Sequence, residues 1–157
     1  METKKRKIPS IPSILILCSL VTFSITSAKE LSAMDLDQFK WKNRLLFLFS
    51  PDRTHPLFKQ LHRAISESKP GVEDRDLVIF EIHESDTSRI DQKHIDSQTA
   101  RSLREKYRVP SGNFTVILVG KDGGVKLRRQ DETQLVDIFG LIDSMPMRQQ
   151  EMRQKKN

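Results

Sequence analysis

The chain has 157 residues, a net charge of +6 and a single cysteine. Its composition, 36% hydrophobic and 31% charged, excludes a multi-span membrane protein, a collagen-like fibre and a disulfide-stapled mini-protein. Lys4, Lys5, Arg6 and Lys7 against Glu2 give +3, which leaves only +3 for everything after them. A nucleic-acid-binding protein needs a stronger or more focused positive field, so no nucleic acid partner is expected.

The first 28 residues have the pattern of an export signal. A basic segment at 1–7 precedes an uncharged segment at 8–28, and Thr26-Ser27-Ala28 places small residues where a signal peptidase cleaves. We therefore expect a signal peptide at 1–28 and an exported protein, either periplasmic or extracellular. An uncleaved membrane anchor is the alternative, because the uncharged segment is just long enough to span a bilayer.

The single cysteine, Cys18, lies within this predicted signal peptide. The mature chain would therefore have no disulfide, no thiol nucleophile and no metal site built on cysteine. Any activity of the exported chain must then depend on residues other than cysteine.

The sequence after the signal peptide divides into three parts. A polar lead-in at 29–38 is followed by a folded domain at 39–146 and by a charged tail at 147–157. Because the tail is polar and terminal, it is expected to be frayed or loosely helical.

The first half of the domain predicts two strands joined by a helix. The continuous apolar runs at 44–49 and 77–82 have strand length and indicate strands buried on both faces. Between them, Thr54 is a suitable N-cap, and an apolar stripe predicts a helix that ends at Lys69-Pro70-Gly71. The polar segment 84–96 is expected to be a surface loop.

The second half of the domain predicts a helix, a strand hairpin and a last helix. The first of these helices begins at Ser97 or Thr99. A glycine-rich turn joins predicted strands at 114–119 and 125–128 into a tight hairpin. Asp131 then caps the last helix, which a proline ends.

The element order β-α-β-α-β-β-α predicts an α/β fold. Two strands joined by a helix are parallel with a right-handed crossover, whereas two strands joined by a tight turn are antiparallel. The simplest packing is a mixed four-stranded sheet flanked by helices, which is the thioredoxin-like arrangement.

Four segments of the sequence carry recognisable motifs, and the last two are long and unusual. They are Trp41-Lys42-Asn43-Arg44, Asp74-Arg75-Asp76-Leu77-Val78, Val119-Gly120-Lys121-Asp122-Gly123-Gly124-Val125-Lys126-Leu127-Arg128 and Ile142-Asp143-Ser144-Met145-Pro146-Met147-Arg148. Through them, residues 39–153 resemble a domain-of-unknown-function family found in exported bacterial proteins and at the C-terminus of vertebrate sushi-repeat-containing X-linked proteins. The resemblance implies a thioredoxin-like fold, secretion and, for the animal members, extracellular-matrix or cell-surface roles. It implies no established enzymatic activity.

The sequence lacks the redox residues of thioredoxins. Redox thioredoxins carry Cys-x-x-Cys between the first strand and its helix, where this sequence has Ser50-Pro51-Asp52-Arg53-Thr54-His55-Pro56. Without sulfur, thiol–disulfide exchange has no attacking atom. Redox thioredoxins also place a cis-proline before the strand that faces the site, whereas this sequence has Gly112-Asn113-Phe114-Thr115. A thioredoxin-type oxidoreductase is therefore rejected.

The turn formed by Asp52, Arg53, Thr54 and His55 is the first candidate binding site. It lies between a strand end and a helix start, the edge at which open α/β sheets bind ligands. The free N–H groups and positive dipole end of the helix, with Arg53 and His55, would favour an anion or a carboxylate. The alternative is that Asp52 or Thr54 caps the helix and the other side chains are solvated.

The histidines give no strong signal for a metal site. His55 and His62 are seven residues apart, which is not the i, i+3 or i, i+4 spacing that chelates one ion. Glu81 and His83 share one face of a predicted strand, where a solvated or hydrogen-bonded pair is the simpler interpretation. No metal site, no cofactor and no catalytic residue is assigned.

Basic residues near the last strand and the C-terminus form the second candidate binding site. The strand contributes Lys126, Arg128 and Arg129, and the tail contributes Arg148, Arg153, Lys155 and Lys156. One positive surface made of both groups would suit an acidic polysaccharide, anionic lipid headgroups or an acidic protein. The alternative is two ordinary solvated faces, balanced by neighbouring acidic side chains.

Together these features predict a secreted, non-redox thioredoxin-like binding module whose partner is a protein or an acidic extracellular polymer. One alternative is an enzyme of unknown class in which Asp52 and His55 perform acid–base chemistry, provided that both face one cavity. Another is a structural or stress-associated exported protein without a small ligand. Contact with a membrane is expected only if the signal peptide is uncleaved.

Overall fold

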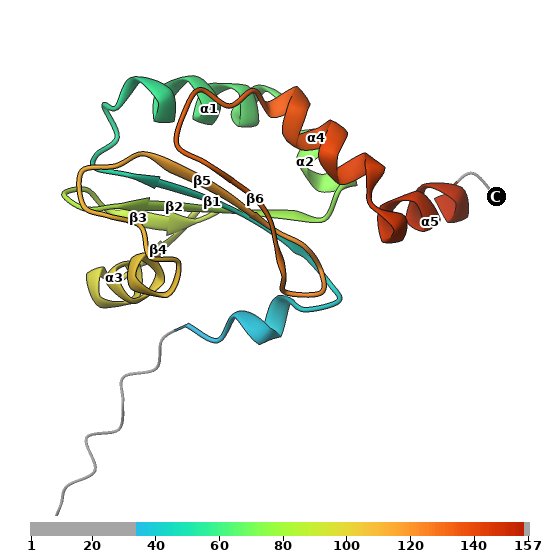
Figure 1. Cartoon of the computed structure of the whole chain (residues 1–157), viewed down its shortest axis with the longest axis horizontal. Helices are drawn as coiled ribbons and strands as arrows, with labels where there is room; N and C mark the ends of the chain where they lie inside the picture. The colour runs from blue at the N-terminus through green and yellow to red at the C-terminus, as the bar shows by residue number, and fades with distance from the viewer. Residues whose placement is uncertain (1–33, 156–157) are drawn as a thin grey trace, which may run out of the picture.

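A mixed six-stranded sheet with helices on both faces forms the centre of the computed structural model, which describes residues 34–155 (Figure 1). The strands are β1 (Arg44–Ser50), β2 (Leu77–His83), β3 (Ser88–Ile90), β4 (Lys93–Ile95), β5 (Thr115–Val119) and β6 (Val125–Arg129). The helices are the 3-10 helix η1 (Leu36–Phe39), α1 (Pro56–Glu67), α2 (Lys69–Asp74), α3 (Ser97–Lys106), α4 (Leu135–Ser144) and α5 (Pro146–Lys155). The predicted signal peptide at 1–28 lies outside the described residues.

The strand order is β4-β3-β2-β1-β5-β6. β1 is parallel to β2 and antiparallel to β5, and it is buried at all seven positions because helices cover both faces of the sheet. The predicted hairpin between β5 and β6 is confirmed, since the Gly120 N–H donates to the Gly124 carbonyl. Gly123 has a φ of 81°, which its missing side chain permits.

Alternate side chains of β1 point into two separate cores. Leu46 and Leu48 belong to the core beneath α1 and α4, which Figure 1 shows on one face of the sheet. Phe47 belongs to the core on the opposite face, beneath α3. Its ring centroid lies 4.4 Å from that of Phe80 and 4.7 Å from that of Tyr107. The strand is therefore buried on both faces, as its continuous apolar run predicted.

The sheet has two more strands than the four that the sequence predicted. β3 and β4 form an antiparallel hairpin within 84–96, which was predicted to be a surface loop. Each strand has only three residues, too few for an alternating pattern to be recognised. The turn places Asp91 at a φ of 51°, and its carboxylate accepts a hydrogen bond of 3.0 Å from the Ile79 N–H. The predicted thioredoxin-like α/β class itself is confirmed.

The helix starts differ from the predictions by a few residues. α1 has His55 rather than Thr54 at its N-cap, without a side-chain cap bond. α3 is capped by Asp96, just before the predicted start, and α4 begins after Gln134 instead of directly after Asp131. The cap depends on which side chain reaches the first free N–H group, and a hydrophobic pattern does not contain that information.

The predicted charged tail, expected to be frayed or loosely helical, forms a helix that packs against the domain. α4 ends at Ser144, before Pro146 as predicted, but Pro146 then begins α5. Arg148 of α5 is buried, so this helix is held against the domain. Within residues 34–155, no helix has the length and apolar character that a membrane crossing requires.

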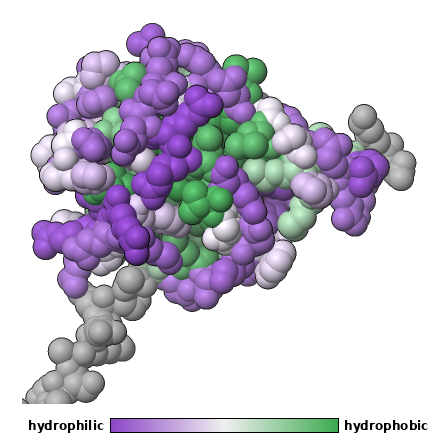
Figure 2. Space-filling model, in the orientation of Figure 1, coloured by the Kyte–Doolittle hydropathy of each residue, from purple (hydrophilic) through white to green (hydrophobic). Residues whose placement is uncertain are grey.

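The surface is largely hydrophilic, and Figure 2 shows a band of hydrophobic residues across the middle of one face. The exposed large hydrophobic side chains are Trp41, Val125, Val136 and Met147. Val125 begins β6, the strand at one edge of the sheet, so apolar surface is available at that edge.

Candidate functional site

The loop at 51–55 lies where the sequence predicted it, at the carboxyl ends of the parallel strands β1 and β2. Ser50 and His83, the last residues of these strands, are partners in the sheet. The loop connects the end of β1 directly to the start of α1. In open α/β sheets this edge is the usual place for a ligand.

The first N–H groups of this loop donate hydrogen bonds to carboxylates of the protein itself. Asp52 accepts hydrogen bonds from the Thr54 N–H at 2.7 Å and from the Thr54 hydroxyl at 2.6 Å. Asp86, between β2 and β3, accepts a hydrogen bond of 2.8 Å from the Arg53 N–H. The hydroxyl and N–H of Thr54 hold the pKa of Asp52 below its ordinary value. A bound anion would have to compete with two charges of its own sign.

The side chains of the loop have different neighbours. Arg53 lines a groove along α1 together with Lys59 and Arg63. His55 instead stacks on Phe114, with ring centroids 5.4 Å apart, and its buried Nδ1 has no hydrogen-bond partner in the part of the chain that the structure describes. The four predicted residues therefore share one turn, but their side chains do not converge on a common point.

A cleft of about 580 Å³ lies beside this loop, between α3 and the segment that follows β2. Arg104 of α3 pairs with Glu84 at 3.0 Å and donates to the Ser50 carbonyl at 3.0 Å. Arg101 also lines the cleft, and it forms no ion pair within the described part of the chain. With Asp86 on the opposite wall, the cleft can hydrogen-bond to a polar group. This cleft could not be predicted from the sequence, because 84–96 was predicted to be a surface loop.

His83 is a buried histidine whose ring nitrogens have no hydrogen-bond partner among residues 34–155. It packs edge-on against Phe58 of α1, with ring centroids 4.7 Å apart. Glu81, on the same face of β2, pairs with His62 Nδ1 at 2.8 Å and not with His83. Burial lowers the pKa of His83, and the charge of Glu81 opposes this effect only in part.

The stability of the chain should decrease below neutral pH because of His83. Its lowered pKa means that the folded state binds fewer protons than the unfolded state once the pH falls below about 6.5, the ordinary histidine value. Its contribution is therefore complete above that pH and is lost as the pH falls through it. We expect the melting temperature to drop between about pH 7.5 and about pH 5.5, and to drop less in His83→Leu.

The control for this measurement is His94→Leu, because His94 is exposed on β4. This variant should keep the pH dependence of the wild type. Carboxylates with lowered pKa values, such as Glu84, lose their contribution only at a more acidic pH. Equal pH dependence in all three proteins would contradict the assignment to His83.

The predicted positive surface is divided between two places. β6 carries Lys126, Arg128 and Arg129, all exposed. Arg128 donates to the Tyr107 carbonyl at the end of α3, which joins β6 to that helix and not to the tail. Arg148 of the tail is buried in ion pairs, and Lys156 lies outside the described residues. Contrary to the prediction, Arg148 does not extend the positive surface of β6, since it is committed to acidic partners.

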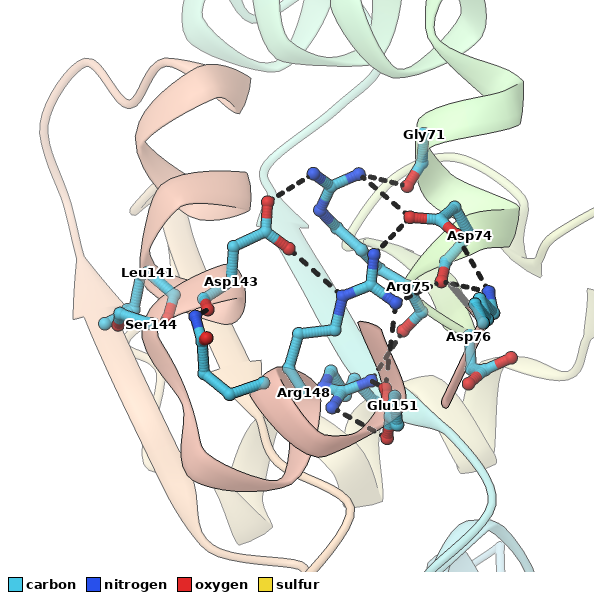
Figure 3. Close-up of polar contacts among 12 residues, drawn as sticks. Gly71, Asp74, Arg75, Asp76, Leu141, Asp143, Ser144, Arg148 and Glu151 are labelled. Carbon is cyan, nitrogen blue, oxygen red and sulfur yellow. Dashed lines mark hydrogen bonds and ion pairs between the residues drawn. The ribbon is translucent and has the colours of Figure 1, made fainter. Parts of the chain in front are cut away.

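A network of ion pairs joins distant segments at the other end of β1 and β2 (Figure 3). Arg44, at the start of β1 and almost fully buried, donates two hydrogen bonds of 3.1 Å to Glu151 of α5. Lys121, which follows β5, pairs with the same carboxylate at 2.8 Å. Burial opposes the ionisation of Glu151, but the hydrogen bonds from Arg44 and Lys121 outweigh it and lower its pKa.

The same network attaches α2 to α4 and α5. Figure 3 shows Asp143 of α4 between the guanidinium groups of Arg75 and Arg148. Arg148 also pairs with Asp74 of α2, and Arg75 lies over the Phe139 ring, 4.2 Å from its centroid. Charge-assisted hydrogen bonds of this kind are stronger than neutral ones, so they hold α5 without an apolar stripe.

Most of the charged residues of this network come from the four motifs that carry the family resemblance, whereas Glu151 lies outside them. The residues that they contribute are Arg44, Asp74, Arg75, Asp76, Lys121, Asp143 and Arg148. These residues could not be connected from the sequence, because the partners within the motifs are up to 74 positions apart and Arg44 is 107 positions from Glu151. The available signal was the charge of the motifs, since each contains a basic residue and all but the first also contain an acidic one.

The fold and the strand-end loop define a thioredoxin-like α/β domain. A reduced 2-Cys peroxiredoxin from Plasmodium vivax has a similar structure, with a TM-score of 0.56 and 16% identity over 73% of this chain and 84% of that chain. Thioredoxin peroxidase I from Plasmodium yoelii also has a TM-score of 0.56, with 17% identity over 73% and 79% of the two chains. At such low identity the similarity concerns the fold alone.

The chain belongs to the family described as domain of unknown function DUF4174, whose model matches residues 35–151. It is 30% identical over 122 residues to the sushi repeat-containing protein SRPX2 of Xenopus laevis, across 76% of this chain and 27% of that protein. It is 31% identical over 120 residues to human sushi repeat-containing protein SRPX, across 74% and 26%. The chain thus spans about a quarter of the length of these relatives. The resemblance found in the sequence is confirmed.

Proposed function

We propose that this chain is an exported, non-redox thioredoxin-like module that acts by binding a protein or an acidic polymer. The observation that carries the proposal is the chemistry of the loop at 51–55. Redox thioredoxins have their cysteine pair at this place, whereas this loop has no sulfur and its N–H groups are bonded to Asp52 and Asp86. A thiol mechanism has no atom with which to act. The groups that remain available are on the surface, in the cleft beside the loop and along β6.

The export part of the proposal is supported by the sequence. The basic segment at 1–7, the uncharged segment at 8–28 and the small residues before position 29 form the pattern of a cleavable signal. The only cysteine, Cys18, falls inside it, which is consistent with a mature chain that does not use thiol chemistry.

Acid–base catalysis by Asp52 and His55 has less support than binding. The Asp52 carboxylate is bonded to Thr54, the His55 ring stacks on Phe114, and no ion pair or hydrogen bond joins these two side chains. A general acid and a general base must both reach one substrate. The arrangement favours a binding role for this edge over a catalytic one.

The test combines a thermal-shift screen of the exported chain with capture of proteins from the exported fraction of its host. Dextran sulfate and polyglutamate serve as acidic polymers. A polymer present at about 100 times its dissociation constant should stabilise the folded chain by about 2.7 kcal/mol, and added salt should reduce the shift. A captured protein that raises the melting temperature would support the proposal equally.

Two variants test which residues bind the acidic polymer and so raise the melting temperature. One outcome would contradict the proposal. Arg53→Ala should keep the shift, because its N–H is already bonded to Asp86 and its side chain lies along α1. Lys126→Ala with Arg129→Ala should reduce it, because both side chains are exposed on β6. Turnover of a substrate that disappears in His55→Ala would replace binding with catalysis as the function.

A further inference from the structure

β6 is an open edge of the sheet. It is the last strand in the order β4-β3-β2-β1-β5-β6 and pairs only with β5. Within residues 34–155, nothing forms a hydrogen bond with the N–H and C=O groups of 125–129 that face away from β5. An edge of this kind is a template on which another extended chain can add as a strand.

The side chains of β6 combine positive charge with apolar contact area. The strand contains Lys126, Arg128 and Arg129 and has no acidic residue. Val125 is 51% exposed, and Leu127 is partly buried against the core. Lys126 pairs with Asp122 at 2.6 Å, but Arg129 has no ion-pair partner in the described part of the chain. The edge therefore presents uncompensated positive charge.

The end of α3 adds to the positive potential beside β6. Arg128 donates to the carbonyl of Tyr107, the C-cap of α3, which places this helix end next to the strand. Lys106 and Arg108 flank Tyr107, are exposed and form no ion pair among the described residues. Asp131 and Glu132 follow the strand, and Glu132 is hydrogen-bonded to Gln60 and Gln134. Basic residues thus predominate around the edge.

We propose that the β6 edge binds an extended acidic segment of a partner protein, which adds to the six-stranded sheet as a further strand. This inference rests on the proposed binding function and specifies the chemistry of the partner. Main-chain hydrogen bonds to 125–129 supply affinity. Acidic side chains opposite Lys126, Arg128 and Arg129 supply specificity.

A second copy of the chain does not fit the same edge. Antiparallel pairing of two β6 strands around Leu127 would set Lys126 of one copy opposite Arg128 of the other, and directly opposed like charges repel. The basic residues therefore protect the edge from self-association and attract an acidic strand. An acidic polysaccharide could pair with the basic side chains of β6, but it lacks the regular N–H and C=O groups that a strand edge pairs with.

The experiment measures the binding of a synthetic peptide of about ten residues that alternates glutamate and valine. Amide hydrogen exchange of the exported chain, with and without this peptide, locates the binding site. We expect the amides of 125–129 to gain protection, because those that face outward become bonded to the added strand. A peptide that alternates glutamate and proline has the same charge but cannot pair as a strand, so it should leave β6 unprotected.

Two double variants separate charge on the edge from overall charge. Lys126→Glu with Arg129→Glu reverses two charges on β6, and Lys59→Glu with Arg63→Glu reverses two exposed charges on α1. The edge variant should bind the glutamate–valine peptide about tenfold more weakly or worse. The helix variant should stay within about threefold of the wild type, because distant exposed charges are screened by salt. Circular dichroism verifies that both variants remain folded.

Several outcomes would overturn this assignment. They are equal binding of the two peptides, equal weakening in the two double variants, and protection confined to residues outside 125–129. If the peptide fails to bind while dextran sulfate or a captured protein stabilises the chain, strand addition at β6 is wrong and the proposed binding function stands. If the peptide, the polymers and the captured fraction all fail, both proposals are wrong.

Discussion

Replacing Glu151 by alanine should lower the free energy of unfolding by about 3 kcal/mol. Arg44 is only 1% exposed, and its two hydrogen bonds to Glu151 offset the cost of burying its charge. Without Glu151 the guanidinium keeps one hydrogen bond, to the Arg75 carbonyl, and loses its carboxylate partner. A loss of this size should lower the melting temperature by roughly 10 °C.

Urea denaturation near neutral pH measures this change, and Gln150→Ala is the matched control. Gln150 is exposed on the same helix, so its replacement should alter stability by less than about 0.5 kcal/mol. The double variant Arg44→Met with Glu151→Met should be more stable than Glu151→Ala, because the buried guanidinium of Arg44 is removed together with its carboxylate partner. A Glu151→Ala protein as stable as the control would show that Arg44 does not depend on this carboxylate.

Replacing Phe47 by alanine should destabilise the chain by about 4 kcal/mol. The ring is fully buried in the centre of the sheet, and it lies between the rings of Phe80 and Tyr107. Its removal deletes apolar contact on several sides and leaves a cavity, because the surrounding rings belong to different elements and can close in only partly. Tyr107 caps α3, so the same change should also loosen the attachment of that helix to the sheet.

The same urea experiment tests Phe47→Ala, with Val136→Ala as its control. Val136 is 73% exposed on α4 and should contribute less than about 0.5 kcal/mol. Amide hydrogen exchange in α3 should increase in Phe47→Ala and stay unchanged in Val136→Ala. A loss below about 2 kcal/mol would mean that the core beneath α3 collapses around the cavity.

The central part of the fold could be predicted because its strands appear in the sequence as short apolar runs, which can be recognised without knowledge of distant residues. The runs that became β1, β2 and β5 are continuous, so their length and burial were evident from the sequence. β3 and β4 were missed because three residues carry no period. The tail was expected to be frayed or loosely helical because it is charged and terminal, and α5 is instead held by buried charges such as Arg148.

The position of the candidate site could be predicted, but not its chemistry. The order of strand and helix placed 51–55 at the sheet edge, and the structure has the loop there. The partner of the Arg53 N–H is Asp86, 33 positions away, and no spacing rule connects them. The tail residues were grouped with β6 because their charges match. Two of them, Arg148 and Lys155, pair instead with Asp74, which belongs to a different part of the chain.

The ion-pair network also has a consequence for the order in which the chain folds. Arg44 and Glu151 are 107 positions apart, and Lys155 is 81 positions from its partner Asp74. Synthesis proceeds from the N-terminus, so β1 is complete long before residues 146–155 exist. Contacts of such long range form late and slow the folding of a domain. Until the last residues are made, the nascent chain therefore lacks the α5 partners of Arg44 and Asp74 at this end of the sheet.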